Sequence, residues 1–239
     1  MSGFRRLLTG MRSMRSRSYG VPASVVQSAV LAAALSAFLG LFLTGITQAA
    51  DTPIKIVTLG DSLSVGHNLP ANAAFPVRLE RALRAKGYVV EVTNAGVSGD
   101  TAAGGLARLD WSVPDDAAAV IVELGANDML RGFDPKVTQR ALEEIVRRLT
   151  ERRIAVLIAG MRAMPNLGIN FANGFEPIYP ELASKYDALL YPFFLDGVAG
   201  DAKLNQRDGL HPTAAGVDVI VGGILPKVEE LIARVRRGS

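Results

Sequence analysis

The sequence of 239 residues contains no cysteine and only two histidines, His67 and His211. The absence of cysteine excludes disulfide bonds, a cysteine nucleophile, a zinc–thiolate site and a lipoprotein anchor. Two histidines are too few for a histidine-rich metal centre. With 49% hydrophobic and 21% charged residues, the chain can bury a core, which argues against intrinsic disorder. The length allows one globular domain, alone or with an extension.

Acidic residues and lysines are missing from the first 50 residues, which hold five arginines. The whole chain has 26 Lys and Arg against 23 Asp and Glu. Without the five arginines, 21 basic residues face 23 acidic ones, a net charge of −2 for residues 51–239. The excess of basic over acidic residues therefore comes from the N-terminal end of the chain. Since a nucleic-acid-binding protein needs a basic face on its folded part, we expect no nucleic-acid partner.

An uncharged stretch of 22 residues, 25–46, follows the arginine-rich start. Thr47-Gln48-Ala49 comes next and offers the small residues that a signal peptidase reads. This layout predicts a secretory signal peptide over residues 1–49, cut after Ala49, and one domain over residues 50–239.

The same stretch is long enough to span a hydrocarbon core of about 30 Å. An uncleaved anchor, with membrane association through residues 25–46, is therefore the alternative to cleavage. With a cleaved signal, we expect a periplasmic or secreted protein. With an uncleaved one, we expect a membrane-anchored protein that faces the periplasm.

Short apolar runs alternate with amphipathic stretches after residue 50. Apolar residues recur at helical spacing over 137–149 and again over 217–232. Strands that alternate with helices favour a mostly parallel sheet of about five strands, with helices on both faces, in a three-layer α/β/α domain. The predicted strands are the runs 54–59, 88–93, 117–124, 154–159 and 189–194.

Sheets of this kind place their functional sites at the carboxyl ends of the strands. Ser62 follows the first predicted strand, in the fragment Gly60-Asp61-Ser62-Leu63. A tight turn at this point can expose the serine hydroxyl and direct the backbone N–H of Ser62 toward a substrate oxygen. A serine that only caps a helix is the alternative.

Two more donors follow the next two predicted strands. Gly96 can offer a backbone N–H to an oxyanion, and a turn glycine is the alternative. Asn127, in Gly125-Ala126-Asn127-Asp128, carries a side-chain amide that can donate to the same oxyanion. An Asx turn made by Asn127 or Asp128 is the alternative.

Asp208 and His211 precede the final helical stretch, in Asp208-Gly209-Leu210-His211-Pro212. A carboxylate three residues before a histidine can hold the imidazole in one tautomer, so that the other nitrogen accepts a serine proton. A surface loop with an incidental histidine is the alternative.

Taken in chain order, these three fragments and Gly96 resemble the GDSL, or SGNH, serine hydrolase family, which is named for its Ser, Gly, Asn and His residues. The resemblance runs from about residue 54 to His211 and beyond, essentially the whole predicted domain. Further fragments are similar to the bacterial periplasmic branch of multifunctional acyl-CoA thioesterases, lysophospholipases and arylesterases. These fragments are residues 60–66, 98–101, 122–133, 179–183 and 192–194.

The resemblance implies a flavodoxin-like SGNH hydrolase fold and the hydrolysis of carboxyl esters and thioesters of acyl chains. It implies Ser62 as the nucleophile, His211 as the base and Asp208 as the residue that orients His211. The implied oxyanion hole consists of the backbone N–H groups of Ser62 and Gly96 and the side chain of Asn127. Members of the branch use no metal or organic cofactor. We expect a small-molecule acyl ester or thioester as the binding partner, and no obligatory protein partner.

Two other functions stay open. A carbohydrate or peptidoglycan O-acetyl esterase uses the same catalytic residues on short acyl groups. Chain-length preference therefore distinguishes it from a hydrolase of longer acyl esters and thioesters. A non-catalytic binding module on the same scaffold would have lost some of these residues. Among the remaining candidates, we interpret His67 as a surface or pocket-rim residue, Asp61 as shaping its turn, and the loop 161–175 as a mobile wall of the acyl site.

Overall fold

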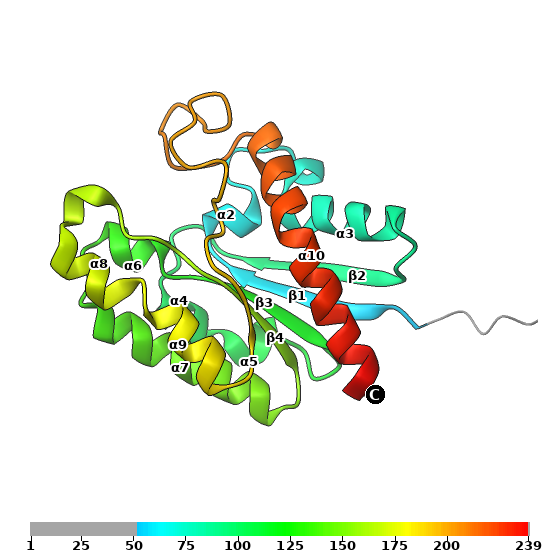
Figure 1. Cartoon of the computed structure of the whole chain (residues 1–239). Coiled ribbons are helices and arrows are strands. Elements are labelled where there is room, and N and C mark those ends of the chain that lie inside the picture. The colour runs from blue at the N-terminus through cyan, green and yellow to red at the C-terminus, as the bar shows by residue number, and fades with distance from the viewer. Residues whose placement is uncertain (1–51, 239) are drawn as a thin grey trace, which may run out of the picture. The chain divides into compact units, whose positions relative to one another are not determined.

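Five parallel strands form the centre of the fold (Figure 1). The computed structural model describes residues 52–238, so the predicted signal segment 1–49 lies outside the described residues. The strands lie in the order β2-β1-β3-β4-β5, and every neighbouring pair is parallel. They are β1 (Ile54–Gly60), β2 (Val90–Gly96), β3 (Ala119–Glu123), β4 (Ala155–Ala159) and β5 (Leu189–Tyr191).

Helices cover both faces of this sheet. α3 and α10 pack together on one face, and α4, α7 and α9 lie on the other (Figure 1). The predicted three-layer α/β/α architecture with a mostly parallel five-stranded sheet is therefore confirmed. The helices are α2 (Ser62–Val65), α3 (Phe75–Ala85), α4 (Ala102–Ala107), α5 (Leu109–Ser112), α6 (Ala126–Leu130), α7 (Pro135–Glu151), α8 (Ile169–Phe175), α9 (Ile178–Lys185) and α10 (Ala214–Gly238). Two 3₁₀ turns, Ala71–Ala73 and Pro165–Leu167, complete the set.

The strand bounds differ from the predicted ones for local reasons. β2 continues to Gly96, because its register pairs Gly96 with Gly60 at the end of β1. β5 is shorter than predicted and ends at Tyr191, since Pro192 has no N–H to donate to a neighbouring strand. All five residues of β3 are buried, as expected of a parallel strand that is covered on both faces.

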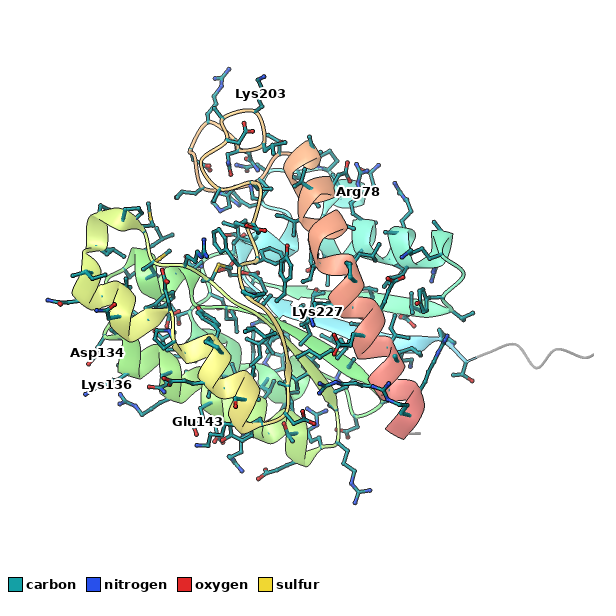
Figure 2. The ribbon with its side chains drawn as sticks, viewed as in Figure 1. Arg78, Asp134, Lys136, Glu143, Lys203 and Lys227 are labelled. Carbon is teal, nitrogen blue, oxygen red and sulfur yellow. The ribbon has the colours of Figure 1, made fainter. Side chains whose placement is uncertain are left out.

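The long helices present their apolar stripes to the sheet. In α7 this stripe is formed from Ala141 onward, but Val137 is exposed and Thr138 is buried in its place. The hydroxyl of Thr138 donates to Oδ1 of Asp128, 3.1 Å away, which satisfies its polar group inside the core. On the outer side of α7, the charged side chains of Lys136 and Glu143 point away from the sheet (Figure 2). Within residues 52–238, no helix is both long and apolar enough to cross a membrane.

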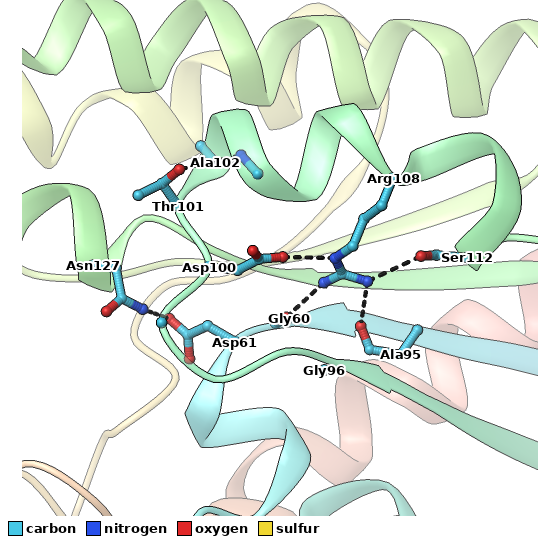
Figure 3. A network of polar contacts seen from close by, with 12 residues as sticks. Gly60, Asp61, Ala95, Gly96, Asp100, Thr101, Ala102, Arg108, Ser112 and Asn127 are labelled. Carbon is cyan, nitrogen blue, oxygen red and sulfur yellow. Dashed lines mark hydrogen bonds and ion pairs between the residues drawn. The ribbon is translucent and has the colours of Figure 1, made fainter.

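A buried arginine fastens the strand ends from which the polar fragments emerge (Figure 3). Arg108 is 6% exposed and forms an ion pair with Asp100, with 2.6 Å between Nε and Oδ2. Its two terminal nitrogens donate to the carbonyl oxygens of Gly60 (2.9 Å) and Ala95 (2.7 Å) and to the hydroxyl of Ser112 (3.0 Å). Gly60 ends β1 and Ala95 lies next to the end of β2. This guanidinium therefore holds together the two strand ends from which the chain enters the candidate site.

Candidate active site

Ser62 is the first residue of α2, and only Asp61 separates it from the end of β1. The cap of this short helix is Asp61, whose Oδ1 accepts the backbone N–H of Leu63 at 2.9 Å. Gly66 ends the helix in the left-handed region, with φ of 81°, where glycine is favoured. Since Asp61 serves as the cap, the Ser62 hydroxyl is left for other partners.

The Ser62 hydroxyl contacts His211, which lies in the loop before α10. Oγ of Ser62 lies 2.9 Å from Nε2 of His211, and Nδ1 of His211 lies 2.7 Å from Oδ2 of Asp208. The structure thus brings together three residues that are separated by up to 149 positions in the chain. The chain of contacts runs from a hydroxyl through an imidazole to a carboxylate, which is the arrangement that can activate an oxygen nucleophile.

Asp208 is held as a carboxylate by its own loop. Its Oδ1 accepts the backbone N–H groups of Leu210 (2.9 Å) and His211 (3.0 Å). These hydrogen bonds, together with the one from the His211 ring, lower the pKa of Asp208 to about 2. The other oxygen is thereby directed at the imidazole in ionised form throughout the neutral pH range.

Asn127 lies on α6, close to the same turn. Its Nδ2 donates one hydrogen to Oδ2 of Asp61 at 2.9 Å, which leaves the second hydrogen of the amide for a ligand (Figure 3). Asp61 therefore does more than shape its own turn, because it also orients the amide of Asn127.

The structure corrects the prediction for Gly96. The backbone N–H of Gly96 donates to Oδ1 of Asn94 at 3.0 Å and is therefore occupied. A Cβ at this position would lie 2.6 Å from the backbone nitrogen of Val65. Close packing of β2 against α2 is thus the physical reason for a glycine at this position, rather than donation to a substrate.

Gly99 was not among the predicted donors, but it offers a backbone N–H that is free within the part of the chain that the structure describes. It lies in a tight turn with φ of 83°, closed by a 3.1 Å hydrogen bond from the N–H of Asp100 to the carbonyl of Val97. Its carbonyl accepts from Nη2 of Arg131 at 2.7 Å, whereas its N–H has no hydrogen-bond partner among residues 52–238. Arg131 directly follows α6, so this contact ties the turn to the helix that carries Asn127. The Ser98-Gly99-Asp100 fragment after β2 was the available signal.

A second missed residue is Glu123, which ends β3 beneath the Ser62 turn. Its side chain is fully buried, and Oε2 accepts from the hydroxyl of Ser64 (2.8 Å) and the N–H of Asp61 (3.3 Å). Oε1 has no hydrogen-bond partner. Burial, and then the nearby Asp61 carboxylate, raise the pKa of Glu123 well above its usual value. Burial also raises the pKa of Asp61, to about 6.

The raised pKa of Glu123 predicts how the stability responds to pH. Because its pKa is raised in the native protein, this carboxyl binds a proton more tightly there than in the unfolded chain, so the free energy of unfolding falls as the pH rises above about 4.5. Glu123→Gln cannot titrate and keeps an oxygen acceptor for Ser64. We expect its stability relative to the wild-type protein to increase between about pH 5 and about pH 8.

Urea denaturation at the two pH values measures this difference, with the exposed Glu91→Gln as the matched control. A difference between Glu123→Gln and wild type that does not change with pH would show that Glu123 is already ionised in the native protein.

The Ser62 hydroxyl opens into a cavity of about 540 Å³. Besides Ser62, Asn127 and His211, most of the side chains that line it are apolar. The predicted wall loop contributes its first part, residues 161–165, whereas Phe175 at its other end is fully buried in the core. The apolar lining includes Met129, Leu130, Met161, Met164, Phe193, Leu195 and Leu210.

The second histidine lies beside the first. The ring centroids of His67 and His211 are 4.6 Å apart, so His67 is a partly buried neighbour of the site, which agrees with the pocket-rim interpretation. Asp128 accepts the N–H of Ala102 at 2.8 Å and so braces α6 against α4. Within the part of the chain that the structure describes, no group of His, Asp or Glu side chains could hold a metal ion.

Comparison with known proteins identifies the family to which the chain belongs. The model of the GDSL-like Lipase/Acylhydrolase family matches residues 58–219, more than half of the chain. The chain belongs to this family. It is therefore a member of a family of ester-hydrolysing enzymes, and the predicted family resemblance is confirmed.

Individual relatives of this GDSL hydrolase are named as esterases or thioesterases. It is 40% identical over 182 residues to an arylesterase of Vibrio mimicus, over 74% of this chain and 88% of that protein. It is 36% identical over 193 residues to the thioesterase 1/protease 1/lysophospholipase L1 of Escherichia coli K12, over 80% and 91% of the two chains. The solved structure of AlinE4, an esterase of the SGNH-hydrolase family, is 45% identical and superposes with a TM-score of 0.64, over 75% and 96% of the two chains.

Proposed function

We propose that this GDSL hydrolase is an exported serine esterase and thioesterase that acts on acyl chains through an acyl-enzyme. The observation that carries the proposal is the contact chain Ser62–His211–Asp208, with distances of 2.9 and 2.7 Å, at the mouth of an apolar cavity. A nucleophile at the edge of an apolar pocket suits a substrate whose reactive carbonyl ends a hydrocarbon chain.

In the proposed mechanism, Oγ of Ser62 attacks the acyl carbonyl carbon while Nε2 of His211 accepts the hydroxyl proton. The ionised Asp208 holds Nδ1–H of His211 and stabilises the imidazolium that forms. His211 then gives the proton to the departing alcohol or thiol, and the acyl group stays on Ser62. Water attacks this acyl-enzyme with His211 again as the base, which releases the acid and restores the hydroxyl.

Three donors are proposed for the oxyanion. They are the backbone N–H of Ser62, the second amide hydrogen of Asn127, and the backbone N–H of Gly99 in place of Gly96. The unoccupied N–H of Gly99 and the attachment of its turn to α6 support this change. Preorganised donors of this type act where the negative charge develops and need no rearrangement during the reaction.

Hydrolysis of p-nitrophenyl esters from acetyl to hexadecanoyl by the purified protein tests the proposal. Activity that is greatest with medium or long chains is the expected result, and acyl-CoA and lysophospholipid would be the next substrates. Activity confined to the acetyl ester would instead indicate a carbohydrate or peptidoglycan O-acetyl esterase. Folded protein without activity on any ester would contradict the proposal and favour a binding module.

Export is the second part of the proposal. It rests on the uncharged stretch 25–46 between an arginine-rich start and Thr47-Gln48-Ala49. We expect the protein in the periplasm or outside the cell, with a new N-terminus at residue 50. Fractionation of producing cells followed by N-terminal sequencing tests this. Intact residues 1–49 in the membrane fraction would instead identify an anchor.

A further inference from the structure

All methionines of the described residues line one cavity. The chain has six methionines, and those at positions 1, 11 and 14 fall outside the described residues. The other three, Met129, Met161 and Met164, all face the cavity beside Ser62. A thioether side chain is unbranched and flexible, so it can adjust to chains of different shape. Three such side chains around one cavity suit a site that accommodates a flexible acyl chain.

Met129 connects two walls of this cavity. It lies on α6, two residues after Asn127, and is almost fully buried. Its Sδ accepts the backbone N–H of Met164 at 3.3 Å. Met164 belongs to the cavity wall 161–165. In the same wall, the backbone N–H of Ala163 donates to Oε1 of Glu176 at 3.1 Å. Two side chains from other elements therefore hold the backbone of this wall, and one of them is Met129.

The position of Met129 links the acyl cavity to the chemistry. The short helix α6 carries both Asn127, the proposed oxyanion donor, and Met129, which contacts the opposite wall. A change in the bulk of Met129 alters the room beside the reacting carbonyl directly. It also moves the wall 161–165, because the wall is attached to Sδ. Both effects act on the space that is available to the acyl chain.

We propose that Met129 is a specificity-determining residue that sets the acyl-chain length this enzyme prefers. The inference rests on the proposed acyl hydrolase function. One methylene more or less in an apolar pocket changes the specificity constant by about 10-fold to 200-fold. A variant that frees the volume of the Met129 side chain should therefore favour longer chains, and a bulkier one should favour shorter chains.

The measurement is the ratio of kcat/KM for the p-nitrophenyl decanoyl ester to that for the butanoyl ester. Met129→Ala should raise the ratio by about tenfold or more, and Met129→Phe should lower it to a similar extent. Met129→Leu nearly conserves the volume but removes the Sδ acceptor of the Met164 N–H. It should change the ratio by less than about threefold, because the volume rather than this hydrogen bond to sulfur sets the room for the acyl chain. Ile169→Ala is the matched control, because Ile169 lies just beyond the wall, is 70% exposed and does not line the cavity.

Alanine and phenylalanine variants that both keep the wild-type ratio within about twofold would overturn the inference. If Met129→Ala does not fold, as judged by circular dichroism, the phenylalanine and leucine variants decide the question. Failure of the underlying function is distinguishable, because the wild-type protein would then hydrolyse neither ester. Ser62-dependent hydrolysis with an unmoved ratio would leave the function intact and remove only the role of Met129.

Discussion

Replacing Ser62 with alanine should lower kcat/KM for acyl esters by roughly 10⁴-fold or more. The variant keeps the cavity, Asn127 and His211, but no oxygen remains 2.9 Å from Nε2 of His211 to attack the carbonyl. The residual rate would come from substrate binding and the oxyanion donors alone. Because Asp61 caps α2 and the Ser62 side chain has no structural partner besides His211, the fold should be preserved.

The p-nitrophenyl ester assay measures this effect on wild type, Ser62→Ala and the control Ser184→Ala. Ser184 is exposed on α9, so its loss should leave the rate unchanged. Thermal unfolding of the variants checks their fold. A folded Ser62→Ala protein with more than a tenth of the wild-type activity would rule out Ser62 as the nucleophile.

The order of elements and the grouping of Ser62 and Asn127 at one edge were predictable from the sequence, whereas His211, in the loop before α10, was placed beside them only by the family resemblance. Apolar runs that alternate with amphipathic stretches predict a parallel sheet, and the carboxyl ends of parallel strands meet at one edge. The sequence needed no contact information for this step. It follows from the direction of the strands alone.

The proposed oxyanion hole contains a residue that the strand pattern alone does not identify. Gly96 ends β2 and Gly99 follows it, and the pattern does not tell which N–H is occupied. The answer depends on Asn94, whose side chain takes the N–H of Gly96, and on Arg131, which holds the carbonyl of Gly99. Both contacts are set by side-chain geometry that no spacing rule contains.

Glu123 was missed for a different reason. An acidic residue at the end of an apolar strand suggests exposure at the strand end, since a buried carboxyl is costly. In the structure it is buried under Ser64 and Asp61, which supply a hydroxyl and an N–H to one of its oxygens. The cost of burial is expressed as a raised pKa, which a sequence pattern does not reveal.

Replacing Asp208 with asparagine should lower kcat by roughly 10³-fold to 10⁴-fold, with less effect on KM. The Oδ1 atom of Asp208 accepts two backbone N–H groups of its loop, so the carbonyl oxygen of an asparagine would keep that position. Its amide nitrogen would then face Nδ1 of His211. An imidazole that accepts a hydrogen bond at Nδ1 carries its proton on Nε2, and it can no longer accept the proton of Ser62.

This loss should persist over the whole pH range of the wild-type enzyme. Hydrogen bonds hold the pKa of Asp208 at about 2, so in the wild-type protein this carboxyl is ionised wherever the enzyme is folded and active, and the acid limb of the pH–rate profile belongs to another group. Asp201→Asn is the matched control. Oδ1 of Asp201 accepts a backbone N–H in the same way, from Lys203, in the same loop. Profiles of kcat for both variants, measured from about pH 5 to about pH 9, decide the matter. An Asp208→Asn enzyme within tenfold of wild type would mean that His211 keeps its productive tautomer without a carboxylate.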